Sequence, residues 1–388
     1  MPALPSVTDH LARVLRLGAP LPARPVRLQP ALGCAVAEDV LAPIDLPPFD
    51  NAAMDGYAVR AAELAAVSLA VVGDGAAGAG TPPPLPPAAA ARVMTGAPIP
   101  AGADTVVPVE DTDRGVPAVR ITAVVRPGAH IRRAGEDVHR GQRAIRAGEP
   151  ITAGRLALLA ALGIPAVTAH RRPVVAVLAT GNELSGAGTP LAPGMIYESN
   201  GAMLAALVRT TGGEPRELPV VHDDPALARS VLVEAARGHD LVLTAGGISA
   251  GDYEVVRQAL GPTGTVAFES VAMSPGRPQG WGTLAGTPLL ALPGNPVGAF
   301  VSYHLFAAPL IRRLLGWAAP EPPWHPEPIA DELTARRGRT RLCLATRTSE
   351  GVRPLPGGHF LSTLAGADRL LRVEHDLAAG DLVPVLEL

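Results

Sequence analysis

The stretch LLALPGNPVGAFVSYHLF, residues 289–306, decides how this chain folds. Its first four residues are apolar and predict a short buried strand. Residues 293–296 contain two prolines, a glycine and an asparagine, which end that strand. From Val297 onward apolar residues recur at helical spacing, so a helix is expected to begin where the turn ends.

Such a turn carries free backbone N–H groups and the positive end of a helix dipole to the carboxyl end of the strand. This arrangement suits a phosphate or another oxyanion. A turn that simply joins the strand to the helix is the other interpretation. The segment alone does not choose between the two.

Two more segments repeat the pattern. Residues 174–180 (VVAVLAT) and 240–244 (DLVLT) predict buried strands. GNEL (181–184) follows the first, and AGGISAGDYE (245–254) follows the second and precedes a helical pattern that ends at Leu260. Because the carboxyl ends of parallel strands meet at one edge of a sheet, the three loops are expected to form one ligand site in an α/β domain.

Composition limits the function classes. At 388 residues the chain is expected to hold more than one domain, and its 3% aromatic content implies cores of Ala, Val and Leu. All 33 basic residues are arginine, so no side chain supplies a titratable amine. A net charge of −3 gives no indication of nucleic-acid binding.

The sequence also gives an expectation of location. No apolar run approaches the roughly 20 residues of a membrane span, and no signal peptide is visible. Cys34 and Cys343 are the two cysteines and lie far apart, which argues against a disulfide scaffold or a zinc site. We therefore expect a cytoplasmic protein without membrane contact.

The rest of the chain supplies helices and short strands. Helices are predicted over residues 6–17, 151–162, 199–210 and 224–236, and a linker over residues 170–173. Residues 66–126 alternate short apolar runs with Gly/Pro clusters, which predicts a small β-barrel or sandwich. Beyond the proline-rich stretch 320–328, short strands predict a compact β domain.

Two polar stretches remain ambiguous from spacing alone. Asp55 precedes a glycine, and an Asp-Gly pair is normally just a turn. Residues 126–138 (RPGAHIRRAGEDV) carry two arginines beside Glu136 and Asp137. A solvated, self-neutralising loop is the favoured interpretation, and a basic anion clamp beside a carboxylate pair is the alternative.

Several motifs together resemble the molybdopterin molybdenumtransferase family, which inserts molybdenum into the pterin dithiolene. They occur in the family's order from residue 47 to 306, and LSTLAGADRL (361–370) continues the similarity more weakly. The matching stretches are PPFDNAAMDGYAV, MTGAPIP, VRPGAHIRRAGEDV, ATGNEL, IYESN, the Asp pair 223–224, TAGGISAGDYE, SPGRP and LPGNPVGAF.

The resemblance implies a multi-domain α/β plus β fold. A discontinuous helical linker domain would comprise residues 1–46 and 140–170, with a β domain of residues 47–139 inserted into it. Residues 171–317 would form a three-layer α/β domain that resembles molybdopterin adenylyltransferase, and residues 318–388 a C-terminal β domain. The family further implies an elongated homodimer, in which each site lies between one chain's α/β domain and its partner's inserted β domain.

The implied reaction converts adenylylated molybdopterin and molybdate, with Mg²⁺, into molybdenum cofactor and AMP. A molybdopterin adenylyltransferase is a further expected partner. Carried over position by position, the implied catalytic residues are Asp55, Thr95, Asp137, Glu183 and Asp252. Of these, Asp55, Glu183 and Asp252 are the implied metal ligands, because Mg²⁺ prefers carboxylate and phosphate oxygens. The implied substrate-binding residues are Arg132, Gly181, Gly246, Gly247, Ser249, Gly251, Ser274, Pro275, Arg277, Pro293, Gly294, Asn295 and Pro296.

This chain departs from the family where molybdate would bind. Ser274 stands where the family usually has Lys, Arg or Gln, Leu344 where it usually has Arg, and Gly358 where it usually has Ser. Arg277 keeps a charge where lysine is frequent, and Arg341 or Arg347 could replace the lost donors. These departures leave a second hypothesis, a weakened paralogue that binds the pterin nucleotide or a partner protein without inserting metal.

Overall fold

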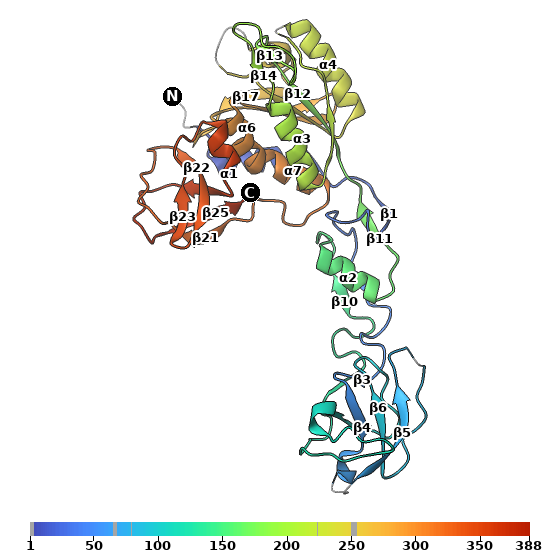
Figure 1. Cartoon of the computed structure of the whole chain (residues 1–388). Helices are drawn as coiled ribbons and strands as arrows, with labels where there is room; N and C mark the ends of the chain where they lie inside the picture. The colour runs from blue at the N-terminus through green and yellow to red at the C-terminus, as the bar shows by residue number, and fades with distance from the viewer. Residues whose placement is uncertain (1–3, 65–67, 79, 223, 250–253) are drawn as a thin grey trace.

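The computed structural model describes residues 4–64, 68–78, 80–222, 224–249 and 254–388. The chain is elongated, with a β body at one end and the α/β part, together with the C-terminal β part, at the other (Figure 1). Helix α2 (Ala153–Ala161) lies between the two ends. No helix in the described part of the chain has the length and apolar content needed to cross a membrane.

A six-stranded mixed sheet forms the centre of the α/β part. Its order is β15 (Glu214–Glu217), β12 (Val174–Ala179), β16 (Leu241–Ala245), β20 (Thr287–Leu292), β19 (Pro278–Leu284) and β17 (Val266–Ser270). The first four strands are parallel, and β19 runs antiparallel to both of its neighbours, β20 and β17. The three predicted strands are therefore adjacent, as expected, but the sheet is not wholly parallel because a hairpin closes one edge.

Helices cover both faces of this sheet. One face packs against α3 (Asn200–Thr211) and α6 (Pro296–Ser302), which continues through the π-helical turn η4 (Tyr303–Ala307) into α7 (Ala308–Leu314). The other face packs against α4 (Pro225–Gly238) and α5 (Val255–Leu260), followed by the short η3 (Gly261–Thr263). This arrangement confirms the predicted three-layer α/β domain.

A five-stranded sheet forms the β body. Its order is β7 (Thr105–Pro108), β4 (Gly56–Val59), β6 (Ala89–Val93), β5 (Leu69–Gly75) and β8 (Ala118–Val119). Two short helical turns, η1 (Ala61–Glu63) and η2 (Val109–Asp111), and the pair β3 (Asn51–Ala52) with β9 (Ile131–Arg132) complete it. The expected alternation of strands and turns over residues 66–126 is incomplete at its end, because the apolar run 119–125 contributes only Val119 to a strand.

The part between the two ends is less helical than expected. It contains two antiparallel pairs of strands: β1 (Ala23–Arg27) with β11 (Ala166–His170), and β2 (Val40–Leu41) with β10 (Arg143–Ile145). Helix α1 (Val7–Leu15) is absent from this region because its apolar side packs against α7 and η4. His170, expected in a linker, instead ends β11.

The C-terminal sheet recruits a strand from the α/β part. Its order is β18 (Met273–Ser274), β22 (Thr340–Thr348), β24 (Arg369–Val373), β25 (Leu382–Glu387) and β21 (His325–Pro328), and β23 (Gly351–Pro354) pairs with β22. The short helix α8 (Leu361–Ala365) packs near α6. Through β18, the turn at Ser274 is held directly against the C-terminal part.

Candidate functional site

A pocket of about 650 Å³ lies where the three small-residue loops meet at the carboxyl ends of β12, β16 and β20. It is bounded on another side by the flap formed by β13 (Leu184–Ser185) and β14 (Ile196–Tyr197). Ten of the predicted site residues line it: Gly181, Glu183, Gly246, Gly247, Ser249, Pro275, Pro293, Gly294, Asn295 and Pro296. The three loops therefore meet at one pocket, as the strand order predicts.

Local sequence explains how these loops hold their shape. Asn295 caps α6, because its side-chain oxygen accepts a hydrogen bond of 3.1 Å from the Gly298 N–H, and Pro296 occupies the first turn. Gly246 has φ +94°, and a Cβ there would lie 2.8 Å from the Thr180 carbonyl oxygen. Only glycine fits that position without strain.

The pocket contains carboxylates and loop backbone. Glu183 and Glu254 are the acidic residues that line it in the described part of the chain. The implied residues Gly251 and Asp252 lie outside the described residues. Arg277 is exposed and does not line the pocket.

Asp55 and Thr95 form a separate constellation in the β body. The Asp55 carboxylate accepts hydrogen bonds from the Thr95 N–H at 2.7 Å and from its hydroxyl at 2.8 Å. These two bonds hold the pKa of Asp55 below its ordinary value, so the exposed carboxylate is ionised at neutral pH. Gly56 is required beside it, since a Cβ would lie 2.0 Å from the Val107 carbonyl oxygen.

The arginine-rich loop lies in the same body. Arg133 donates a 2.6 Å hydrogen bond to Asp50, and Glu136 accepts one of 2.8 Å from the Arg133 N–H. Arg133 is therefore neutralised by carboxylates of its own body, as the favoured interpretation expects. Arg132, which pairs with Asn51 in the strand ladder, and Asp137 are both exposed.

Within one chain the two groups are far apart. The β body that carries Asp55 and Thr95 lies at the opposite end of the molecule from α6 and the flap strands (Figure 1). A single chain therefore does not bring Asp55 together with Glu183.

Several residues that line the pocket were not predicted as site residues, and the polar ones include Thr180, Asn200, Glu254 and His359. Thr180 directly follows β12, and Asn200 and Glu254 belong to the motifs IYESN and AGGISAGDYE, so position after a strand or within a motif was an available signal. His359 comes from the C-terminal part, more than 50 residues beyond the last loop motif, and no local pattern marks it.

Ser274 faces a cation that the sequence did not indicate. The Arg336 guanidinium donates a 2.8 Å hydrogen bond to the Ser274 hydroxyl. Arg336 lines a second pocket of about 720 Å³, which also contains Arg337 and Arg339. Pro275, the next residue after Ser274, already belongs to the first pocket.

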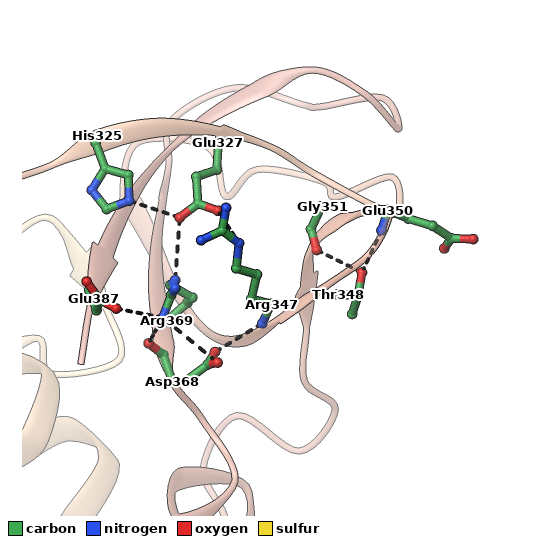
Figure 2. A network of polar contacts seen from close by, with 9 residues as sticks. All are labelled: His325, Glu327, Arg347, Thr348, Glu350, Gly351, Asp368, Arg369 and Glu387. Atoms are coloured by element: carbon green, nitrogen blue, oxygen red, sulfur yellow. Dashed lines mark hydrogen bonds and ion pairs between the residues drawn. The ribbon is translucent and has the colours of Figure 1, made fainter. Parts of the chain in front are cut away.

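The two arginines expected as substitutes are engaged elsewhere. Arg341 donates a hydrogen bond to the Thr334 carbonyl oxygen. Arg347 pairs with Glu327, which also contacts His325 and Arg369 (Figure 2).

Leu344 and Gly358, the other two residues that depart from the family pattern, differ in burial. Leu344 is 2% exposed and belongs to the core, whereas Gly358 is exposed. Arg341 faces Ser274 across the β18–β22 ladder, but the guanidinium that hydrogen-bonds the Ser274 hydroxyl is that of Arg336.

The fold and the pocket define a multi-domain α/β protein whose loops suit an oxyanion-bearing ligand. Residues 5–163 match the family described as MoeA N-terminal region (domain I and II), and residues 176–313 match the family described as probable molybdopterin binding domain. The chain is 42% identical to molybdopterin molybdenumtransferase 2 of Mycobacterium tuberculosis, across 99% of both chains. It is 37% identical to molybdopterin molybdenumtransferase of Haemophilus influenzae, across 79% of this chain and 76% of the relative.

A solved structure agrees with these sequence matches. The crystal structure of the molybdopterin biosynthesis moeA protein from Pyrococcus horikoshii matches with a TM-score of 0.82 and 27% identity, across 99% of this chain and 100% of that one. The chain belongs to the molybdopterin molybdenumtransferase family.

Proposed function

We propose that this protein is a molybdopterin molybdenumtransferase, which inserts molybdenum from molybdate into adenylylated molybdopterin and releases AMP. One observation carries the proposal: three loops at the carboxyl ends of adjacent strands form one pocket around the Glu183 carboxylate. The naming of full-length relatives as transferases supports it.

The loops would bind the diphosphate of the substrate. Gly294 and Asn295 have backbone N–H groups directly before α6, where the helix dipole favours an anion. Gly246 and Gly247 let the backbone of the second loop approach a ligand closely, because neither has a side chain. The adenylyl phosphate would therefore be fixed by backbone donors.

Mg²⁺ fits this donor set without a preformed cage. The described residues contain no group of three or more His, Cys, Asp or Glu side chains that could hold a metal ion by itself. Mg²⁺ does not require one, since it is usually held by one or two carboxylates together with substrate phosphates. Glu183, Asp55 and the undescribed Asp252 are the proposed ligands. When bound, Mg²⁺ would neutralise charge on the diphosphate.

Asp55 would reach the pocket only from a second chain. We propose a homodimer in which the partner's β body brings Asp55 and Thr95 to the loops, with Asp137 and Arg132 at its edge. The separation of the β body from the pocket within one chain supports this arrangement. Thr95 would keep Asp55 ionised, and the carboxylate would then orient the attacking group or hold Mg²⁺.

The molybdate end of the site would use Arg336. Ser274 is neutral, but Arg336 adds a guanidinium, which donates charge-assisted hydrogen bonds to oxyanions. Ser274, Pro275 and Arg277 would complete this end. The hypothesis of a weakened, binding-only paralogue rested on missing donors, and Arg336 removes its main argument.

The remaining proposals rest on the family. They are a cytoplasmic location, a molybdopterin adenylyltransferase as a partner that supplies the nucleotide, and the division into domains at residues 46/47, 139/140, 170/171 and 317/318.

One reconstitution tests the function. The purified protein is incubated with adenylylated molybdopterin, Mg²⁺ and molybdate, and both AMP and active cofactor are measured. The proposal predicts that both appear together and that both depend on molybdate and Mg²⁺. AMP without cofactor, or neither product, contradicts it.

A further inference from the structure

Two residues that line the pocket have a buried side-chain oxygen atom without a hydrogen-bond partner. Four buried side-chain atoms in the described part of the chain have no partner, and the residues of two of them, Thr180 and Asn200, line this pocket. Thr180 is 5% exposed and Asn200 is 8% exposed. Because buried polar groups are nearly always paired, this concentration calls for an explanation in terms of a ligand.

The free atom of Asn200 can only accept a hydrogen bond. Its amide nitrogen donates a 2.8 Å bond to the Gly294 carbonyl oxygen, in the turn before α6. That contact fixes the orientation of the amide and leaves Oδ1 as the unpartnered atom. An acceptor repels a phosphate oxygen, so Asn200 is suited to a different part of the ligand from the one that the loop N–H groups bind.

Thr180 stands at the carboxyl end of β12, directly under the second loop. A Cβ added to Gly247 would lie 3.0 Å from its hydroxyl oxygen. Valine has the same shape as threonine without the hydroxyl, so a purely structural role would favour valine in this buried place. The hydroxyl can accept as well as donate.

The apolar lining of the pocket gives a further indication of the ligand. Ile248 and Pro293 contribute apolar surface between the loops, which suits a flat ring better than a sugar or a phosphate. We propose that Asn200 and Thr180 recognise the edge of the ligand's pterin ring that carries adjacent N–H donors, namely the ring N–H and the exocyclic amine. This inference rests on the proposed function, since it assigns a place in the pocket to the pterin of that substrate.

The test uses three variants of the full-length protein and two probes. Thr180→Val removes the hydroxyl at constant shape, and Asn200→Ala removes the acceptor together with the hydrogen bond to the Gly294 carbonyl oxygen. Thr244→Val is the matched control, because its hydroxyl is equally buried and unpartnered on the neighbouring strand but does not line the pocket. Binding of 6-hydroxymethylpterin, followed by its fluorescence, reports on the ring, and inorganic diphosphate reports on the loops.

Thr180→Val is expected to weaken pterin binding about tenfold, while diphosphate binding and thermal stability stay unchanged or stability rises. Thr180→Ser, which keeps the hydroxyl, should restore pterin binding. Asn200→Ala should weaken pterin binding at least as much, and Thr244→Val should leave both probes unaffected.

Three outcomes overturn the inference. They are unchanged pterin affinity in Thr180→Val and Asn200→Ala, an equal loss for Thr244→Val, and a wild-type protein that binds diphosphate but not the pterin probe. The reconstitution assay separates the two levels. If the wild type makes active cofactor and Thr180→Val binds pterin normally, the proposed recognition of the pterin edge is refuted. The transferase assignment then remains intact.

Discussion

Arg336→Gln is expected to raise the molybdate concentration that gives half-maximal turnover. The guanidinium of Arg336 hydrogen-bonds Ser274, one residue before the pocket wall at Pro275, and Gln keeps a donor but loses the charge. A hydrogen bond to a charged group contributes roughly 1.5–3 kcal/mol where water is excluded. Arg336 is exposed, so solvent and salt reduce that contribution to about 1 kcal/mol, or about a fivefold shift.

The assay is steady-state cofactor formation with molybdate and the pterin nucleotide varied separately. Arg337→Gln is the matched control, because Arg337 lines the same second pocket but makes no hydrogen bond to Ser274 in the described structure. The shift for Arg336→Gln should shrink as ionic strength rises. Unchanged molybdate dependence, an equal shift for Arg337→Gln, or an equal shift for both substrates would refute the assignment of Arg336 to the oxyanion.

Three further predictions concern catalysis, the helix cap and pH. Asp55→Asn should lower turnover by at least about a hundredfold and leave the melting temperature nearly unchanged, because the amide oxygen can still accept the Thr95 hydrogen bonds but supplies no charge to the reaction; activity within a few-fold of wild type would contradict this. Asn295→Ala should lower stability by about 1 kcal/mol through loss of the α6 cap, whereas Asn295→Asp should keep stability and weaken diphosphate binding, as thermal melts and titrations can show. Burial lowers the pKa of His304 to about 4, so folding favours its neutral ring and this stability is lost as pH falls from about 6.5 toward about 4. Between about pH 7.5 and pH 5, the free energy of unfolding measured in urea should therefore fall by about 2 kcal/mol less for His304→Phe than for the wild type. An equal fall in the two proteins would disprove this.

Much of the α/β part could be predicted because its signals are local. Apolar runs ended by Gly and Pro marked β12, β16 and β20, and parallel pairing brought the following loops together. The hairpin edge of β19 and β17 was missed, since β19 (PQGWGTL) contains a proline and two glycines, which are rare within strands.

Contacts between distant segments could not be predicted. Helix α1 lies within the predicted range 6–17 and begins with a capping box at Ser6, yet its packing partners lie near residues 303–314, which no periodicity in α1 reveals. Arg336 is 62 residues from Ser274, and the two meet because β18 joins the C-terminal sheet. Arg341 and Arg347 were considered on sequence proximity, but neighbouring carbonyl and carboxylate groups engage them.

The central claim is that two chains build each active site, and subunit mixing tests it most directly. Asp55→Asn chains and Glu183→Gln chains are each expected to be inactive alone. In an equal mixture half of the dimers are mixed, and one of the two sites in each mixed dimer carries both wild-type residues. Activity should therefore return to about a quarter of the wild-type value once subunits exchange. If exchange is verified by mass spectrometry and activity does not return, the shared site is wrong.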